Sequence, residues 1–459
     1  MVKALSALWK KISNLTLPSF TTNVLARTIW EASLTLFGVI FSIIIARCLG
    51  PYGKGIINTI QQFGALAGSF VSPGLYSALQ YFIASRKCTI KEGISNFIFF
   101  TLVYSFPLTF LILFLSPYFT HNILKGVPLH LLTVYIIFFL LSTYFAPTSI
   151  VLSALQRFPQ LTFIGIVQLF SKLLLLILFL IIIKMDVWGA FLPDWLLFPL
   201  DIYLSFYFLR DVIKISFFKP SLNKTLLKGL LNYGLKVFMI GLLGRIILRV
   251  DVFFVNYYQS PAAVGLYMTG VSYTEFIRLI PSAVGTVLFA RVSATREEEA
   301  KNLTTLITRT YIIFIPLLSV FLLLLAHIII PLFYGARFIP SIGVVGYLLP
   351  GVIALCFASP LGQYLNGRGF PEFNLYAGAM GVFLTLVGDF LLIPKMGIKG
   401  AALVSSIAYI ATFLILLHFF HSYTKASLKE IFSPRKEDML YILQVFKEKL
   451  ASIKRKELK

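Results

Sequence analysis

The sequence predicts an all-α polytopic membrane protein, with twelve transmembrane helices in two pseudo-symmetric six-helix bundles and a central cavity. Three observations predict this class. The 459 residues are 58% hydrophobic and only 13% charged, a balance that a soluble domain could not bury. The apolar residues gather into twelve segments that are each long enough to cross a bilayer. Short motifs also recur about 211 residues apart, which indicates an internal repeat.

The predicted spans alternate with short polar turns, and several contain Pro or Gly, which membrane helices tolerate. They are expected at about residues 23–47, 56–83, 93–116, 129–153, 161–183, 187–209, 231–257, 263–290, 309–332, 341–366, 372–394 and 400–420.

The longer polar stretches divide the chain into four parts. Residues 1–209 form the N-terminal six-helix bundle with an amphipathic N-terminal segment, and residues 210–230 form a cytoplasmic linker. Residues 231–421 form the C-terminal six-helix bundle, and residues 422–459 a basic amphipathic tail that lies on the inner membrane surface. None of these parts leaves room for a soluble catalytic domain.

Lys and Arg distribute unequally between the two sides of the predicted membrane. With the N-terminus inside, the interior segments before the tail hold 18 basic residues and the exterior segments hold 7. This bias places both termini in the cytoplasm and the protein in the cytoplasmic (inner) membrane. The net charge of +22 is then a topology signal and an attraction to anionic membrane lipids, and it does not indicate a nucleic-acid partner.

The internal repeat consists of three pairs of like segments. They are Leu49-Gly50-Pro51 with Gly55 and Ser260-Pro261 with Gly265, Phe158-Pro159 and Phe370-Pro371, and Lys184-Met185-x-Val187-x-Gly189-Ala190 and Lys395-Met396-x-Ile398-x-Gly400-Ala401. Six crossings in each half make the repeats parallel, related by an axis along the membrane normal. The interface between the halves is the expected place for the cavity.

Motifs for catalysis are absent from the sequence. It has no GxxxxGK[ST], GxSxG or HExxH motif, and its three cysteines show no CxxC spacing. We therefore expect no enzyme activity, no cofactor and no metal site.

Charged residues inside the seventh and eighth spans carry the main functional signal. Arg245, Arg249 and Asp251 lie in the seventh span, and Glu275 and Arg278 near the centre of the eighth. An ionised side chain at that depth costs about 2.5–3.5 kcal/mol on insertion scales, so such groups face a protein interior or a watery cavity. A structural ion pair and an anion-binding site both remain open at this point.

Depth in the hairpin suggests which residues pair. The seventh and eighth spans form a helical hairpin that turns near Ser260–Pro261. Arg245 lies 15 residues before position 260 and Glu275 lies 15 residues after it, so both lie at the same depth and we expect them to form an ion pair. Arg249 and Arg278 then have no obvious partner at their own depth, which makes them the leading candidates for binding an anion. Asp251 is expected to reach a neighbouring helix.

The first half of the chain offers fewer charges inside its spans. Glu31 and Arg27 stand four residues apart in the first span. Either Glu31 is a coupling site for a proton or cation, or the two residues form a local ion pair. Lys172 in the fifth span is a weaker candidate for the anion, or a partner of an acidic residue in the sixth span, which contains Asp194 and Asp201.

Several motifs in order resemble the oligosaccharide-lipid flippases of the polysaccharide-biosynthesis transporter family, within the multidrug/oligosaccharidyl-lipid/polysaccharide exporter superfamily. These are Ala46-Arg47-x-Leu49-Gly50-Pro51-x-x-x-Gly55, Asp251 with Gly265-x-Tyr267, Leu332-Phe333-Tyr334-Gly335 with Phe338 and Pro350-Gly351, and Ile393-Pro394-x-x-Gly397-Ile398-x-Gly400-Ala401-Ala402. The resemblance runs to about Phe420. Asp389 departs from it, because this family commonly has Asn there.

The resemblance implies that the chain flips a polyprenyl-diphosphate-linked oligosaccharide across the membrane by alternating access, for cell-surface polysaccharide assembly. It also implies a polysaccharide polymerase and glycosyltransferases as partners. Guanidinium groups suit a diphosphate because they pair bidentately with phosphate oxygens. The alternatives are an ion-coupled exporter of small organic cations, which would need acidic residues to dominate the cavity, and a membrane-embedded glycosyltransferase or polymerase, which would need large outer loops.

Overall fold

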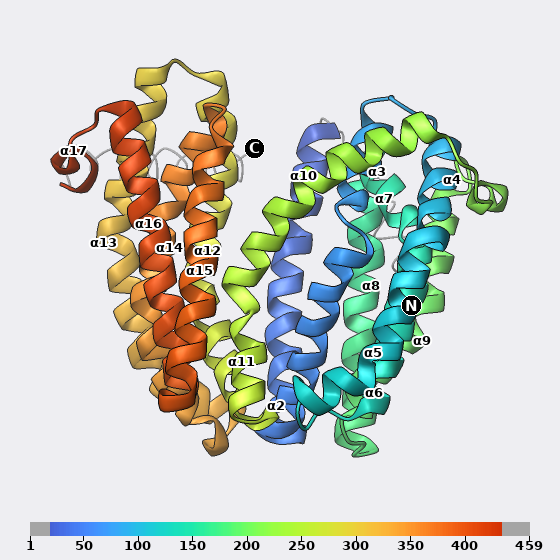
Figure 1. Ribbon diagram of the computed structural model, residues 1–459, viewed down its shortest axis with the longest axis horizontal. Coiled ribbons are helices and arrows are strands. Elements are labelled where there is room, and N and C mark those ends of the chain that lie inside the picture. Colours follow the sequence, from blue (N-terminus) through green and yellow to red (C-terminus); the bar gives the residue numbers. More distant parts are fainter. Residues whose placement is uncertain (1–18, 434–459) are drawn as a thin grey trace, which may run out of the picture. The chain divides into compact units, whose positions relative to one another are not determined.

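The computed structural model describes the backbone of residues 19–433 and the side chains of residues 29–433, and this part of the chain is helical throughout (Figure 1). The helices of the first half are α2 (Ser19–Val71), α3 (Leu75–Ala84), α4 (Ile90–Phe100), α5 (Phe106–Asn122), α6 (Leu129–Phe145), α7 (Pro147–Ala154), α8 (Phe158–Leu176) and α9 (Trp188–Leu209). Two π-helical turns, η1 (Thr101–Ser105) and η2 (Ile177–Ile182), join α4 to α5 and extend α8.

The second half begins after the 3₁₀ turn η3 (Ile215–Phe218). Its helices are α10 (Lys224–Arg249), α11 (Asp251–Tyr258), α12 (Pro261–Ala294), α13 (Glu297–Ile329), α14 (Pro340–Gly367), α15 (Pro371–Met396), α16 (Ile398–Thr424) and α17 (Leu428–Phe432), with the short turns η4 (Ile330–Tyr334) and η5 (Ala336–Phe338) before α14. Most bounds lie near those of the predicted spans, although α2 runs through the first two expected spans and α13 begins earlier than expected. Several prolines, such as Pro281 and Pro350, lie inside helices and do not end them.

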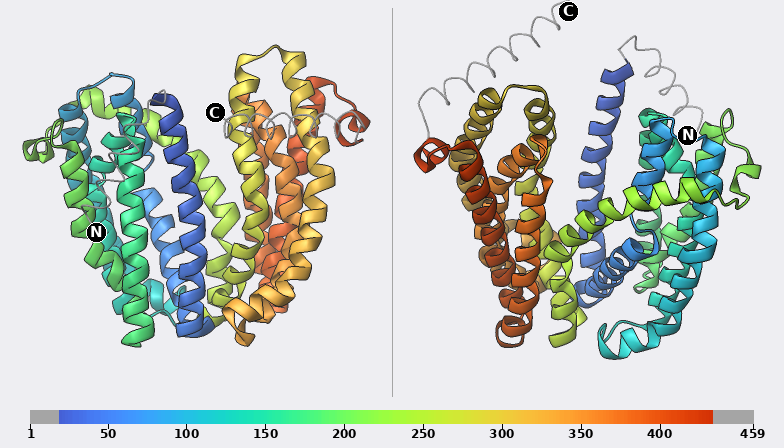
Figure 2. Two further views of the ribbon diagram at one scale, coloured as in Figure 1. Left: turned by 180° about the vertical axis from the view of Figure 1, so that it is seen from behind. Right: turned by 45° about the horizontal axis from the view of Figure 1, so that its top comes forward.

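The chain folds into two compact units, and each unit contains segments from both halves of the sequence. Unit 1 contains residues 1–49, 63–117 and 128–239, and unit 2 contains residues 50–62, 118–127 and 240–459. Two short segments of the first half therefore pack within unit 2. Figure 2 shows the helices of each unit from two further sides. The sequence-based division at residues 209 and 231 stays a prediction about topology.

Eight described helices are long and apolar enough to cross a membrane, or nine if the bent pair α6 and α7 counts as one span. This confirms a multi-pass, all-helical membrane protein. In α2 the helix is interrupted at Gly50, whose φ of 67° and ψ of −171° lie outside the helical region. Glycine adopts this conformation without the strain that a Cβ would bring.

The core of unit 1 is built from aliphatic side chains of its short helices. Leu75 and Leu79 of α3, Ile94 and Ile98 of α4 and Val151 of α7 are all fully buried in one cluster. α4 begins with a capping box, in which the Thr89 hydroxyl accepts from the Glu92 amide at 3.2 Å and the Glu92 carboxylate accepts from the Thr89 amide at 3.0 Å.

The core of unit 2 forms where α12, α14 and α16 pack together. Small residues allow close approach there. The Ser406 hydroxyl fits against Gly351, accepts its amide hydrogen at 3.1 Å and donates to the carbonyl of Tyr347 at 2.6 Å. Such contacts hold membrane helices together, because lipid gives no hydrophobic force between them.

Within unit 2, the two segments of the first repeat pair pack against each other. A Cβ on Gly55 of α2 would lie 1.6 Å from the carbonyl oxygen of Pro261, and a Cβ on Gly265 of α12 would lie 2.0 Å from the carbonyl oxygen of Pro51. The Pro-x-x-x-Gly segments thus cross through their glycines, each against the proline carbonyl of the other. This reciprocity gives the sequence repeat a physical reason.

The third repeat pair makes equivalent local contacts in the two units. A Cβ on Gly189 would lie 3.0 Å from Cβ of Met185, and a Cβ on Gly400 would lie 3.0 Å from Cβ of Met396. In each case the glycine packs on the methionine four residues before it, where one helix follows another. The motif Lys-Met-x-[Val/Ile]-x-Gly-Ala therefore gives the same glycine–methionine contact twice, although the link between η2 and α9 is longer than that between α15 and α16.

Candidate functional site

The charged cluster of unit 2 lies where the seventh predicted span is interrupted. α10 ends at Arg249, Val250 forms the break, and α11 begins at Asp251, so these charges stand at a helix junction and not inside a continuous helix. Arg249 is therefore the basic residue in the last turn of α10, and Asp251 is the acidic residue in the first turn of α11. Both positions suit the dipoles of the two helix ends.

Arg249 and Glu275 form the ion pair of this cluster. The Nη2 group of Arg249 donates to Oε1 of Glu275, and Nη1 reaches the carbonyl oxygen of Leu248 at 3.3 Å. The expected pair of Arg245 with Glu275 is wrong, because Arg245 is exposed and its neighbour one turn later takes the carboxylate. Counting from the hairpin turn failed because residues four apart share a helix face, so the count could not choose between Arg245 and Arg249.

Arg278 of α12 has no hydrogen bond or ion pair with any residue of the described part. It lines a cavity of about 490 Å³ in unit 2, together with Glu275, Ser282, Ser359 and Gln363. Glu275 and Arg278 are the charged residues of this lining and balance each other in charge, but the Glu275 carboxylate is already paired with Arg249. The arrangement offers an anion a free guanidinium group and several neutral hydrogen-bonding side chains.

Asp251 is buried beside this cluster and does reach neighbouring helices. Its Oδ2 atom accepts from the hydroxyl of Tyr267 on α12 and from that of Ser405 on α16, the latter at 3.1 Å. Its Oδ1 atom has no hydrogen-bond partner in the described part. The expectation that Asp251 contacts an adjacent helix is confirmed.

A second buried carboxylate, that of Asp389 on α15, was missed as a site residue. It is fully buried, neither of its oxygens has a hydrogen-bond partner among the described residues, and it interacts electrostatically with Asp251. Three buried carboxylate oxygens of neighbouring acids without hydrogen-bond donors are unusual, because an unpaired buried charge is strongly unfavourable. The available signal was Asp389 itself, an acid inside an apolar span.

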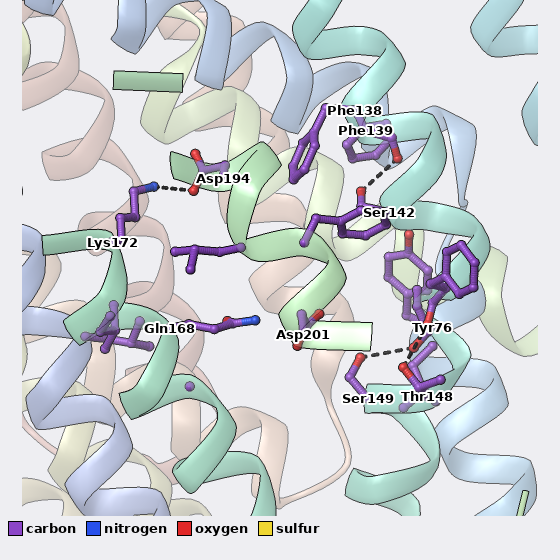
Figure 3. Close-up of a pocket in the computed structure, with 18 of the residues that line it drawn as sticks. Tyr76, Phe138, Phe139, Ser142, Thr148, Ser149, Gln168, Lys172, Asp194 and Asp201 are labelled. Atoms are coloured by element: carbon purple, nitrogen blue, oxygen red, sulfur yellow. Dashed lines mark hydrogen bonds and ion pairs between the residues drawn. The ribbon is translucent and has the colours of Figure 1, made fainter. Parts of the chain in front are cut away.

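Unit 1 contains a second polar cavity, of about 610 Å³, between α6, α8 and α9. Nζ of Lys172 on α8 lies 2.6 Å from Oδ1 of Asp194 on α9, and one turn away the amide of Gln168 points toward Asp201 (Figure 3). Pairing of Lys172 with an acidic residue of the sixth span is thereby confirmed. This pairing offsets the charge that Lys172 was expected to present to an anion.

The coupling candidates of the first span are only partly described. Glu31 is exposed on α2, and its carbonyl oxygen accepts from the hydroxyl of Thr35 at 3.0 Å. The side chain of Arg27 lies outside the described residues, so the expected pair of Arg27 and Glu31 stays a prediction.

One further ion pair lies beyond the helix ends. The Arg157 guanidinium, before α8, binds the carboxylate of Asp211, after α9, with Nη1 to Oδ1 at 3.0 Å and Nη2 to Oδ2 at 2.5 Å. The hydrogen bonds from Arg157 hold the pKa of Asp211 below its usual range. This bidentate pair joins the ends of α8 and α9, the two helices that line the unit 1 cavity.

The fold and these sites define a multi-pass, all-helical membrane protein. Its fold is similar to that of solved membrane transporters. Lipid II flippase MurJ in an inward closed conformation matches with a TM-score of 0.68 and 17% identity, over 95% of this chain and 99% of that one. A multidrug resistance MATE family transporter of the MOP superfamily, facing inward, matches with a TM-score of 0.66 and 15% identity, over 88% and 98%.

The chain belongs to the polysaccharide biosynthesis protein family, whose model matches residues 44–343. An uncharacterized membrane protein of Methanocaldococcus jannaschii is 23% identical over 391 residues, which cover 80% of this chain and 76% of that protein. The family that the motifs resemble is thereby confirmed.

Proposed function

We propose that this protein moves a polyprenyl-diphosphate-linked oligosaccharide across the cytoplasmic membrane, by alternating access, for cell-surface polysaccharide assembly. The observation that carries the proposal is Arg278. In a chain of a polysaccharide biosynthesis family, it leaves a guanidinium group without an acidic partner in a membrane-embedded cavity. Such a group is costly in a membrane unless it has an anion to bind, and a lipid diphosphate is an anion that must cross.

The roles of the three arginines differ. Arg278 would bind the diphosphate directly, because its planar fork matches two phosphate oxygens. Arg249 would share its charge between Glu275 and the substrate, since its Nη1 group makes only a long bond to Leu248. Arg245 is exposed one turn earlier on α10 and would attract the diphosphate without binding it tightly.

The helices support twelve crossings in two six-helix halves as part of the same proposal. Nine candidate spans are present when α6 and α7 are counted together. The break at Gly50 divides the first candidate, residues 29–71, into two crossings. α9, and α10 with α11, occupy the remaining predicted positions. The central cavity, the cytoplasmic termini and the biosynthetic partners stay predictions.

A second candidate is transport coupled to a proton or cation, as an exporter of organic cations would also require. The three donor-free oxygens of Asp251 and Asp389 favour it, because a bound proton or cation would satisfy them. Coupling is compatible with flipping, so it adds to the proposal and does not compete with it. Glu31 is a weaker coupling candidate because it is exposed.

The test measures translocation of lipid-linked oligosaccharide in vesicles that contain the purified protein. Arg278→Ala should abolish transport, and Arg278→Lys should restore only part of it, because lysine keeps the charge and loses the bidentate fork. Arg291→Ala is the matched control, since Arg291 is exposed in the last turn of the same helix. Full transport by Arg278→Ala would refute the assignment of the site. A wild type that moves organic cations but no lipid-linked oligosaccharide would refute the function.

A further inference from the structure

The unit 1 cavity has a lining unlike that of the unit 2 cavity. α8 contributes Gln168 and Lys172, four residues apart and so on one face, and α9 contributes Asp194 and Asp201, seven apart and also on one face. Donors and acceptors thus face each other across the cavity at two levels, about one turn apart on α8 and about two turns apart on α9 (Figure 3). Further hydroxyl groups come from Tyr76, Ser142, Thr148 and Ser149.

Aromatic rings form the rest of this lining. Phe138, Phe139 and Phe145 of α6 and Trp30 of α2 face the same space as the polar residues. Flat apolar surfaces beside dense hydrogen-bonding groups are what a sugar ring requires, because its faces are lined by C–H groups and its rim by hydroxyl groups. The volume of about 610 Å³ also lies in the range of about 300–1,000 Å³ that small-molecule sites occupy.

The net charge of the lining separates the two cavities. Asp194 and Asp201 outweigh Lys172, so the lining of the unit 1 cavity has one net negative charge, whereas Arg278 and Glu275 balance in the lining of the unit 2 cavity. A diphosphate would be repelled from the unit 1 cavity, and Lys172 is already engaged by Asp194. The cavity therefore suits a neutral polyhydroxylated ligand better than a phosphate.

Trp30 lies at the boundary between this cavity and a smaller one. The second cavity, of about 280 Å³, shares Trp30, Ser149 and Ile150 with the first and adds neutral polar residues such as Gln80 and Ser153, which hydrogen-bond to each other at 2.9 Å. The indole is held there by Gly165 of α8, because a Cβ at Gly165 would lie 2.1 Å from its Cζ3 atom. One aromatic residue thus borders two successive polar compartments.

We propose that the two cavities of unit 1 bind successive sugar residues of the transported oligosaccharide, with Trp30 as the aromatic surface between them and Asp201 as the principal hydroxyl acceptor. The inference rests on the proposed function and specifies which part of the substrate unit 1 recognises. It assigns Lys172 to the sugar and not to the diphosphate. Each carboxylate–hydroxyl bond would be charge-assisted and so strong enough to select one glycan over another.

Two other occupants fit parts of the lining. A lipid chain would fit the aromatic wall but would leave the Lys172–Asp194 pair without polar contacts. An organic cation would fit the net negative charge and the rings, but it would leave the amide and hydroxyl groups unused. The test is designed so that either of these would be detected.

The experiment measures binding of three soluble probes to the purified full-length protein by isothermal titration calorimetry. The first is the free oligosaccharide, released by mild acid from the lipid-linked pool of the source cells, which carries no phosphate. The second is inorganic pyrophosphate, which carries no sugar. The third is tetraphenylphosphonium, an organic cation.

The variants separate the two cavities. Asp201→Asn and Trp30→Ala should each weaken oligosaccharide binding about tenfold and leave pyrophosphate binding unchanged, because a charge-assisted hydrogen bond or a stacking surface is lost. Arg278→Ala should do the reverse. Trp188→Phe is the control for tryptophan replacement, since Trp188 stacks on His130 and does not line either cavity. Trp30→Phe keeps an aromatic ring and should retain most of the affinity if Trp30→Ala unfolds.

Three results would overturn the inference. The first is oligosaccharide binding that Asp201→Asn and Trp30→Ala both leave unchanged. The second is a wild type that binds pyrophosphate but no oligosaccharide. The third is tetraphenylphosphonium that displaces the sugar and whose binding is lost in Asp201→Asn. A failure of the proposed function looks different, because pyrophosphate would then not bind, or would bind independently of Arg278, and lipid-linked oligosaccharide would not move.

Discussion

The glycine crossing in unit 2 gives the sharpest prediction about stability. Gly55→Ala places a Cβ 1.6 Å from the carbonyl oxygen of Pro261, and Gly265→Ala places one 2.0 Å from that of Pro51. Real Cβ atoms essentially never approach a heavy atom closer than 3.0 Å, so the helices must separate by at least 3.0 − 1.6 = 1.4 Å in the first variant and 3.0 − 2.0 = 1.0 Å in the second. The obstacle is backbone on both sides, so no side-chain rotation relieves it.

The magnitude follows from the cost of overpacking. Inserting a methyl group into a well-packed core typically costs about 1–3 kcal/mol, and a clash with a carbonyl oxygen belongs at the upper end. Gly241 and Gly244 of α10 are the matched controls, because a Cβ there meets nothing within 4 Å. At these positions alanine should stabilise the helix by about 0.5–1 kcal/mol through its smaller loss of backbone entropy.

The assay is thermal unfolding of the purified protein in one detergent, at one scan rate for all variants because unfolding of large membrane proteins is rarely reversible. The Tm should fall most in Gly55→Ala, less in Gly265→Ala, and should hold or rise in Gly241→Ala. If Gly55→Ala unfolds at the temperature of Gly241→Ala, the helices do not cross through the glycines and the explanation of the repeat is wrong.

Three further predictions concern the charged groups. The exchange variant Arg249→Glu with Glu275→Arg should transport better than either single substitution, because each single change strands a charge; equal losses in all three would argue against the pair. Asp389→Asn should raise the Tm, since it removes an unpaired buried carboxylate, and should abolish any dependence of the Tm on sodium or pH that the wild type shows; an unaltered dependence would remove Asp389 from coupling. The pKa of Asp211 is lowered in the folded protein, so its bond to Arg157 should stabilise the folded state above the ordinary carboxyl pKa and weaken as the pH falls through the lowered pKa; a pH titration of the Tm that Asp211→Asn leaves unchanged would contradict this.

The sequence predicted the fold well because the relevant signals are local. Apolar runs of about 20 residues mark the membrane segments, and a glycine marks the interruption of α2 at Gly50. The repeated Pro-x-x-x-Gly was visible as a pattern, but its meaning was not. That Gly55 and Gly265 pack against each other's proline carbonyl depends on how helices meet, which a linear sequence does not contain.

The site was harder to predict for the same reason. Counting residues from the hairpin turn placed Arg245 opposite Glu275, and the count would hold only for two uninterrupted helices. Arg249 lies four residues after Arg245 on the same face of α10, and it is Arg249 that binds the carboxylate. Pairing between α8 and α9 was easier to foresee, because Lys172 and Asp194 lie on consecutive spans and a buried lysine needs a carboxylate.

What the sequence could not show is how the charges balance around each cavity. Arg245, Arg249 and Arg278 look equivalent in the chain, yet one is exposed, one is paired with a carboxylate and one has no partner among the described residues. Of the three, only Arg278 lines the cavity of unit 2 and has no carboxylate bound to it, so our proposal assigns the diphosphate to Arg278. The cavity beside Lys172 has one net negative charge, which we expect to disfavour a diphosphate and to leave the site to a sugar. A lipid-linked oligosaccharide is itself divided in this way, with its charge at one linkage and its hydroxyl groups elsewhere, so the proposed carrier would bind one part in each unit.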